Sequence, residues 1–174
     1  AYENLVSTAE RRALQNGSEY TTVRLSDFMG IIPAITGKVE LVYEGEQEGA
    51  AHVAQHLISD AIHSFFPAYF PKIEKLEKLD EKTPYSDIID WFFSESGFEL
   101  LDDCNDEVYR KTLDAIKPLD ILIKKYQPQV DEKEVYFMKE FLLWGLVEYD
   151  KLSKDRIASG YQFTDKFGSY LNKL

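Results

Sequence analysis

The sequence is poor in cysteine, in long apolar runs and in positive charge. Cys104 is its single cysteine, so no disulfide can form within the chain, and this usage fits a reducing compartment. No apolar run approaches the roughly 18 residues that cross a bilayer. Acidic residues outnumber basic ones 31 to 20, and the net charge of −11 repels nucleic-acid phosphates and anionic lipid. We therefore expect a cytoplasmic protein whose partners are neither membranes nor nucleic acids.

Motifs that hold nucleotides, metal ions or nucleophiles are also absent. The chain contains no GxxxxGK[ST] phosphate loop, no GxGxxG fingerprint, no GxSxG nucleophile elbow and no EF-hand spacing. The carboxylates around Cys104 in DDCND oppose thiolate formation, and one cysteine cannot build a thiolate zinc cluster. Glu44, Glu46 and Glu48 would repel phosphate, so their stretch is interpreted as a solvated turn. We predict no catalytic and no cofactor-binding residue, and no enzyme activity for this chain by itself.

The apolar content is sufficient for a packed core. The 174 residues are 44% hydrophobic and 14% aromatic, which suits one domain or two small ones that fold without disulfides or metals. We expect a mainly α fold, a multi-helix bundle with a small β element. The expected helices are 2–16, 27–36 (kinked or short because of Pro33), 48–66 ending at Pro67, 83–94, 105–116, 132–152 and a short one after Thr164. The expected other segments are an extended piece at 21–25, strand-like alternation at 39–43 and 161–163, a charged helix or linker at 72–82 and a turn at 118–126.

Two groups of side chains have a structural interpretation. Phe137, Phe141 and Trp144 recur at a three-to-four-residue step, which is typical of a helix face in a core. Arg11 and Arg12 lie in the first expected helix, and we interpret both as solvated charges.

All three histidines lie in the helix expected at 48–66. At 100° per residue, His52, His56 and His63 fall at about 0°, 40° and 20°, and Asp60 falls at about 80°. HxxxH spacing can chelate zinc or nickel through neutral imidazoles. An apolar arc over about 100° to 260° faces the core, so the histidine stripe points away from it. That arc consists of Ala50, Val53, Ala54, Leu57, Ile58, Ala61 and Phe65. We interpret the histidine stripe as a solvated or partner-facing surface, with a metal site as the alternative.

Three stretches carry a family resemblance. NLVSTAERRAL followed by VRLSDF is similar to the helical lid that follows the ATPase core in AAA+ proteins. PAITGKVELVYEGEQEGA and FLLWGLVEYDKLSKDRI resemble the C-terminal part of magnesium-chelatase subunit I-like, MoxR-related AAA+ ATPases. The resemblance covers most of the chain, and ITGKVELVYEGEQEG is its most specific piece.

The resemblance implies a division of the chain and a role for it. Residues 1–37 would be AAA+ lid-like helices, and residues 38–174 would form a helical C-terminal domain that docks a partner or subunit. The parent protein would be a chaperone-like ATPase that uses ATP and Mg²⁺, with its Walker motifs upstream of the matched region. The implied partners are that upstream ATPase core, further copies of the parent in a homo-oligomer and an unknown protein client. No catalytic residue is carried over.

Two alternatives stay open at this point. Residues 151–174 carry five basic and two acidic residues, and the segments LSKDRI and SGYQFT could form the wing of a winged-helix-like interaction or DNA-binding module. The total charge of the chain argues against DNA. The other alternative is a small metal-binding enzyme, which rests on the histidine stripe alone.

Overall fold

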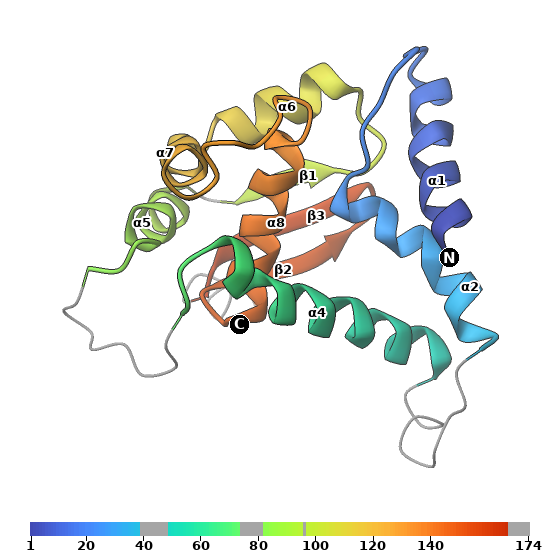
Figure 1. Ribbon diagram of the computed structural model, residues 1–174, viewed down its shortest axis with the longest axis horizontal. Coiled ribbons are helices and arrows are strands. Elements are labelled where there is room, and N and C mark those ends of the chain that lie inside the picture. Colours follow the sequence, from blue (N-terminus) through green and yellow to red (C-terminus); the bar gives the residue numbers. More distant parts are fainter. Residues whose placement is uncertain (39–48, 74–81, 96, 167–174) are drawn as a thin grey trace.

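The computed structural model describes residues 1–38, 49–73, 82–95 and 97–166, which are mainly helical with a small antiparallel sheet (Figure 1). This confirms the expected fold class at that level, whereas the lid-like nature of the first helices stays a prediction. The helical elements are α1 (Tyr2–Gln15), the 3₁₀ helix η1 (Leu25–Ile31), α2 (Ile32–Thr36), α4 (Ala50–Tyr69), α5 (Ser86–Ser94), α6 (Asp106–Asp114), α7 (Lys117–Tyr126) and α8 (Val135–Glu148). The strands are β1 (Phe98–Leu101), β2 (Leu152–Ile157) and β3 (Gly160–Asp165).

Several expectations fall wholly or mostly outside the described residues. These are the strand-like alternation at 39–43, the turn with Glu44, Glu46 and Glu48, the charged segment at 72–82 and the last short helix. Elsewhere the expected segment at 27–36 is present as two short elements, η1 and α2, with Pro33 in the first turn of α2. Proline is tolerated there because the first N–H groups of a helix have no partner inside it.

α4 does not end at Pro67, as its sequence predicts, but continues to Tyr69. Proline lacks the N–H that would bond to the carbonyl oxygen of His63, four residues earlier. Tyr149 is the residue that follows α8, and its hydroxyl group donates a hydrogen bond to the His63 carbonyl oxygen at 3.1 Å instead. A tertiary contact therefore satisfies the carbonyl group that proline leaves without a partner, and the last turn persists.

α8 is shorter than the expected helix at 132–152, because its C-terminus closes in a Schellman arrangement. The Lys151 N–H bonds to the Leu146 carbonyl oxygen at 2.8 Å, and the Asp150 N–H bonds to that of Val147 at 2.9 Å. Asp150 takes a φ of 60°, a left-handed conformation that aspartate tolerates better than most residues. The chain reverses there and enters β2 directly.

The strands form one sheet in the order β1-β3-β2, antiparallel throughout. β2 and β3 make a hairpin in which Ile157 faces Gly160, so two residues form the turn. Tyr161 and Phe163 are buried on one face, which confirms the expected strand at 161–163. An added Cβ at Gly160 would lie 2.1 Å from the Leu100 carbonyl oxygen, so only glycine allows β1 to pair this closely.

α8 is the central element, in contact with α4, α6, α7, η1 and β2. Its residues from Met138 to Leu146 are buried. Phe141 and Trp144 belong to this core, as expected, and Phe137 is partly buried against it. Leu25 joins the same core from the N-terminal segment. The division of the chain at residue 37 stays a prediction, and packing across it is continuous.

Candidate functional site

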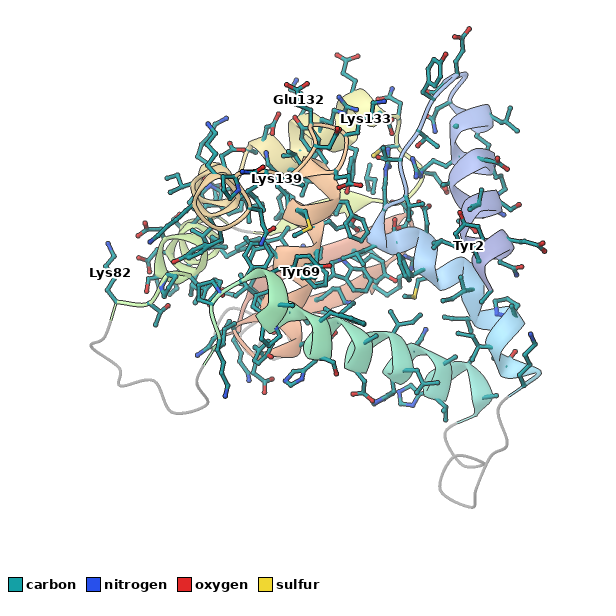
Figure 2. The ribbon with its side chains drawn as sticks, in the orientation of Figure 1. Tyr2, Tyr69, Lys82, Glu132, Lys133 and Lys139 are labelled. Carbon is teal, nitrogen blue, oxygen red and sulfur yellow. The ribbon has the colours of Figure 1, made fainter. Side chains whose placement is uncertain are left out.

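An open apolar groove of about 860 Å³ lies between η1, α2, α4 and α8. Phe28, Ile31 and Ile35 line it from η1 and α2, and Phe137 and Phe141 line it from α8. Tyr69 projects from the end of α4 toward α8 (Figure 2), where its ring meets Phe141 edge-on with centroids 5.6 Å apart. Concave sites of 300 to 1,000 Å³ are typical of binding pockets.

α4 presents two apolar stripes rather than one. Its buried stripe consists of Ala54, Ile58, Ile62 and Phe66. Its second stripe lines the groove and consists of Leu57, Ala61, Phe65 and Tyr69, of which Leu57 is 49%, Phe65 63% and Tyr69 43% exposed. The prediction that Leu57, Ala61 and Phe65 face the core was wrong, because all three are exposed. We call this second set the exposed stripe.

The groove carries little polar chemistry. Lys133 and Glu134 are the charged residues among those lining it, and both are exposed. A catalytic site needs an acid, base or nucleophile held in a set geometry. The other lining residues offer mainly apolar surface.

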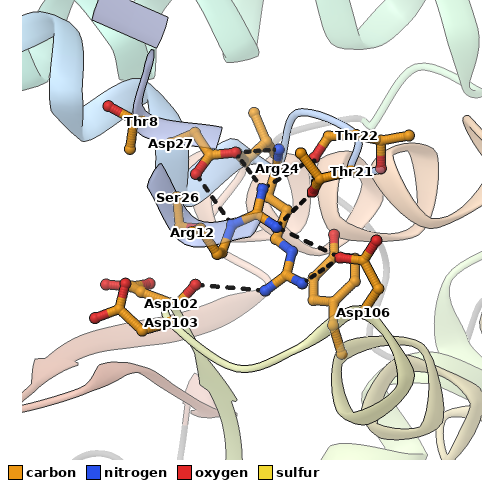
Figure 3. A network of polar contacts seen from close by, with 12 residues as sticks. Thr8, Arg12, Thr21, Thr22, Arg24, Ser26, Asp27, Asp102, Asp103 and Asp106 are labelled. Carbon is orange, nitrogen blue, oxygen red and sulfur yellow. Dashed lines mark hydrogen bonds and ion pairs between the residues drawn. The ribbon is translucent and has the colours of Figure 1, made fainter. Parts of the chain in front are cut away.

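A buried polar network joins α1, the start of η1 and α6 (Figure 3). Arg12 pairs with Asp27 at 2.7 Å, and both side chains are 4% exposed. Arg24 pairs with Asp106 at 2.7 Å, and its guanidinium lies 4.0 Å above the Tyr109 ring. These pairs tie α1 and η1 to α6, because Asp106 begins that helix.

The prediction that Arg12 is a solvated charge was therefore wrong, whereas Arg11 is exposed as expected. The signal for Arg12 was present in the sequence. At 100° per residue Leu5, Ala9 and Ala13 fall at about 0°, 40° and 80°, Arg12 falls at the edge of that arc at about −20°, and Arg11 falls at about 240°. A charge at the edge of a buried apolar arc needs a partner when the helix packs on that side.

Glu140 of α8 is fully buried and holds η1 in place. Its carboxylate accepts hydrogen bonds from the N–H groups of Leu25 at 2.8 Å and Ser26 at 3.3 Å, and from the Tyr109 hydroxyl at 2.7 Å. Burial raises the pKa of Glu140 from 4.5 to about 6, and outweighs these hydrogen bonds and the nearby charge of Arg24, which favour the anion. Sequence reasoning missed this residue because it lies within an apolar helix.

Two other cations make close contacts with neighbouring side chains. Lys139 on α8 contacts Asp114 at 2.5 Å and Asp120 at 2.6 Å. Lys154 on β2 lies with its Nζ 3.2 Å from the centroid of the Trp144 ring. Burial lowers the pKa of Lys154 from 10.5 to about 8, and Glu148 partly counteracts this.

The histidine stripe is exposed as expected, but its members do not come together as one set. His52 and His56 adjoin, with their Nε2 atoms 3.3 Å apart. His63 stacks on Tyr149 instead, at a centroid distance of 4.2 Å. Within the described ranges, no group of three or more histidine, cysteine, aspartate or glutamate side chains is arranged to hold a metal ion. The Cys104 thiol donates to the Leu101 carbonyl oxygen at 3.2 Å.

Comparison with protein-family models, with curated proteins and with solved structures gave no match in any of the three. The AAA+ resemblance therefore stays a prediction. Among the helices of the described residues, none combines the length and the apolar character needed to cross a membrane.

Proposed function

We propose that the chain is a non-catalytic docking domain whose groove receives an amphipathic helix with a basic polar face from a partner protein. The observation that carries this proposal is the exposed stripe on α4. Large apolar side chains that stay exposed beside a preformed concave surface are typical of protein-binding sites. The stripe runs from Leu57 to Tyr69, which at 1.5 Å per residue is about 18 Å, or the length of a helix of about 12 residues.

The charge of the chain favours a basic partner. The net charge is −11, and the turn before α8, at one end of the groove, carries Asp131, Glu132 and Glu134 against Lys133 (Figure 2). Opposite charge speeds association and fixes the orientation of a docked helix. The same net charge disfavours a second copy of this chain as the occupant.

The sequence resemblance extends the proposal to the origin of the partner. In a MoxR-related AAA+ protein, this chain would supply the lid and a docking domain next to an ATPase core that binds ATP and Mg²⁺. The docked helix would then belong to a subunit of that assembly or to its client. This extension rests on the resemblance, and a P-loop and Walker B aspartate encoded upstream of Ala1 would support it.

The winged-helix alternative has one feature in its favour, the hairpin β2–β3 joined to β1. DNA-binding modules of this type need an exposed recognition helix, whereas α8, which precedes the hairpin, is buried along most of its length. The wing's cations are also engaged: Lys154 lies against Trp144, and Arg156 pairs with Asp102. Docking is therefore the better-supported function.

A pair of synthetic helices tests the groove. Both carry leucines along one face, and their polar faces carry lysine in one peptide and glutamate in the other. Fluorescence anisotropy should show that the lysine peptide binds at least tenfold more tightly, with a difference that shrinks as salt is added. Binding of neither peptide at about 1 mM would refute the proposal, and equal binding would refute its charge component.

Two exposed phenylalanines provide a matched comparison. Phe65→Ala removes an exposed side chain inside the groove, and Phe93→Ala removes one that is 75% exposed on α5, outside it. Burying a phenylalanine contributes about 1.5 to 3 kcal/mol, so Phe65→Ala should weaken peptide binding by about tenfold or more. Phe93→Ala should leave it unchanged. A dimer of the free chain that Phe65→Ala dissociates would instead identify a second copy as the occupant, and would refute a separate partner.

A further inference from the structure

The two histidines that adjoin on α4 have the spacing of a chelating pair. His52 and His56 are one helical turn apart, and both are exposed on the side of α4 away from its buried stripe. Their Nε2 atoms lie 3.3 Å apart, and their ring planes meet at 69° with centroids separated by 4.4 Å. The helix backbone fixes this spacing, because residues four apart lie on the same face.

The distance between the two nitrogens agrees with coordination of one metal ion. Zn–N bonds are about 2.0 to 2.1 Å long, so two nitrogens 3.3 Å apart subtend about 107° at a shared ion, close to the tetrahedral angle of about 109°. Imidazole suits zinc, copper and nickel. In the metal-free pair, one Nε2 carries the proton that it donates to the other. Metal binding requires both Nε2 lone pairs, so each ring then holds its proton on Nδ1.

We propose that His52 and His56 chelate one divalent first-row transition-metal ion, with Zn²⁺ as its representative, through their two Nε2 atoms. Water fills the remaining coordination positions. The other two members of the predicted stripe are not ligands: His63 is stacked on Tyr149, and Asp60 forms no group of three with the two histidines. The site has two protein ligands and open positions, and it does not depend on the function of the groove.

Zinc titration of four variants tests this site. Isothermal titration of the full chain at pH 7.5 should show one Zn²⁺ per chain. His52→Gln and His56→Gln should each weaken binding at least tenfold, because one ligand cannot chelate. His63→Gln is the matched control, since it changes the third histidine of the same helix, and it should bind within twofold of the wild type. Glutamine is polar and all three positions are exposed, so circular dichroism should confirm that each variant folds.

Acid supplies a second readout. Protons compete with metal for imidazole nitrogen, so binding should be lost at pH 5. Absence of binding at about 1 mM Zn²⁺ and pH 7.5 would overturn the proposal. Unchanged binding in the His52→Gln, His56→Gln double variant would also overturn it, because the ion would then occupy a different site. A loss of zinc affinity in His63→Gln equal to that in the two single variants would also overturn the proposal.

Discussion

Glu140 gives the sharpest prediction, because a single buried carboxylate should set part of the pH dependence of stability. Its pKa is about 6 in the folded protein and 4.5 as its ordinary value. Between these values the folded chain binds more protons than the unfolded chain, so this group makes stability fall as pH rises through that window. The difference of about 1.5 between these two pKa values corresponds to about 2 kcal/mol of folding stability, at 1.36 kcal/mol per pKa unit.

Glu140→Gln removes this titration while keeping the shape of the side chain. The amide oxygen can still accept from the Leu25 N–H, but the amide nitrogen cannot accept, so one of the three hydrogen bonds is lost. The wild-type carboxyl group is protonated at pH 4 and keeps acceptor capacity on both oxygens, so we expect the variant to be less stable than the wild type at that pH by about 1 to 3 kcal/mol. Between pH 4 and pH 7 the wild type should lose about 2 kcal/mol relative to the variant.

Urea unfolding at half-unit steps from pH 4 to pH 7, followed by tryptophan fluorescence, measures this difference. Other groups titrate in both proteins, so their contributions cancel when the two curves are subtracted. Glu99→Gln on β1, where the side chain is exposed, is the control, and its curve should run parallel to that of the wild type. A Glu140→Gln curve parallel to the wild type within about 0.5 kcal/mol would refute the reasoning, since the charge would then carry no burial penalty.

Two further substitutions test packing. Arg12→Met leaves Asp27 buried without its partner, so urea unfolding should show a loss of about 3 to 5 kcal/mol, whereas Arg11→Met at the neighbouring exposed position should stay within about 0.5 kcal/mol. Similar losses of stability in the Arg12→Met and Arg11→Met variants would contradict the buried Arg12–Asp27 pair. Trp144→Ala should cost about 3 to 5 kcal/mol because the side chain is fully enclosed, and a loss below about 1 kcal/mol would contradict that burial.

Local sequence patterns predicted those helix ends that depend on residues nearby in the sequence. α6 begins at Asp106, within one residue of the start expected at 105, and the Asn105 side chain accepts from the Val108 N–H at 2.9 Å. The end of α4 was mispredicted because Tyr149, about 80 residues away in sequence, satisfies the carbonyl group that Pro67 leaves open. A boundary that rests on such a contact is beyond any local pattern.

The two buried charges of α8 show the same limit. Lys139 and Glu140 interrupt an otherwise apolar helix, and no spacing rule identifies their partners. Lys139 contacts Asp114, 25 residues earlier, and Glu140 contacts Leu25, 115 residues earlier. A helix that is apolar all round is expected to be buried, so the sequence did contain the signal that both charges need partners.

The groove, in contrast, is indicated by a pattern in the sequence itself. With Ile62 and Phe66 included, the apolar residues of the helix expected at 48–66 cover about 220° of its circumference, whereas a helix that packs on one core needs an apolar stripe of about 100°. The structure divides that wide arc into the buried stripe and the exposed stripe, which lie side by side on α4. The excess of about 120° is more apolar surface than folding of this helix requires. Such surface is retained at a cost in solubility, and that cost is offset when a partner covers it.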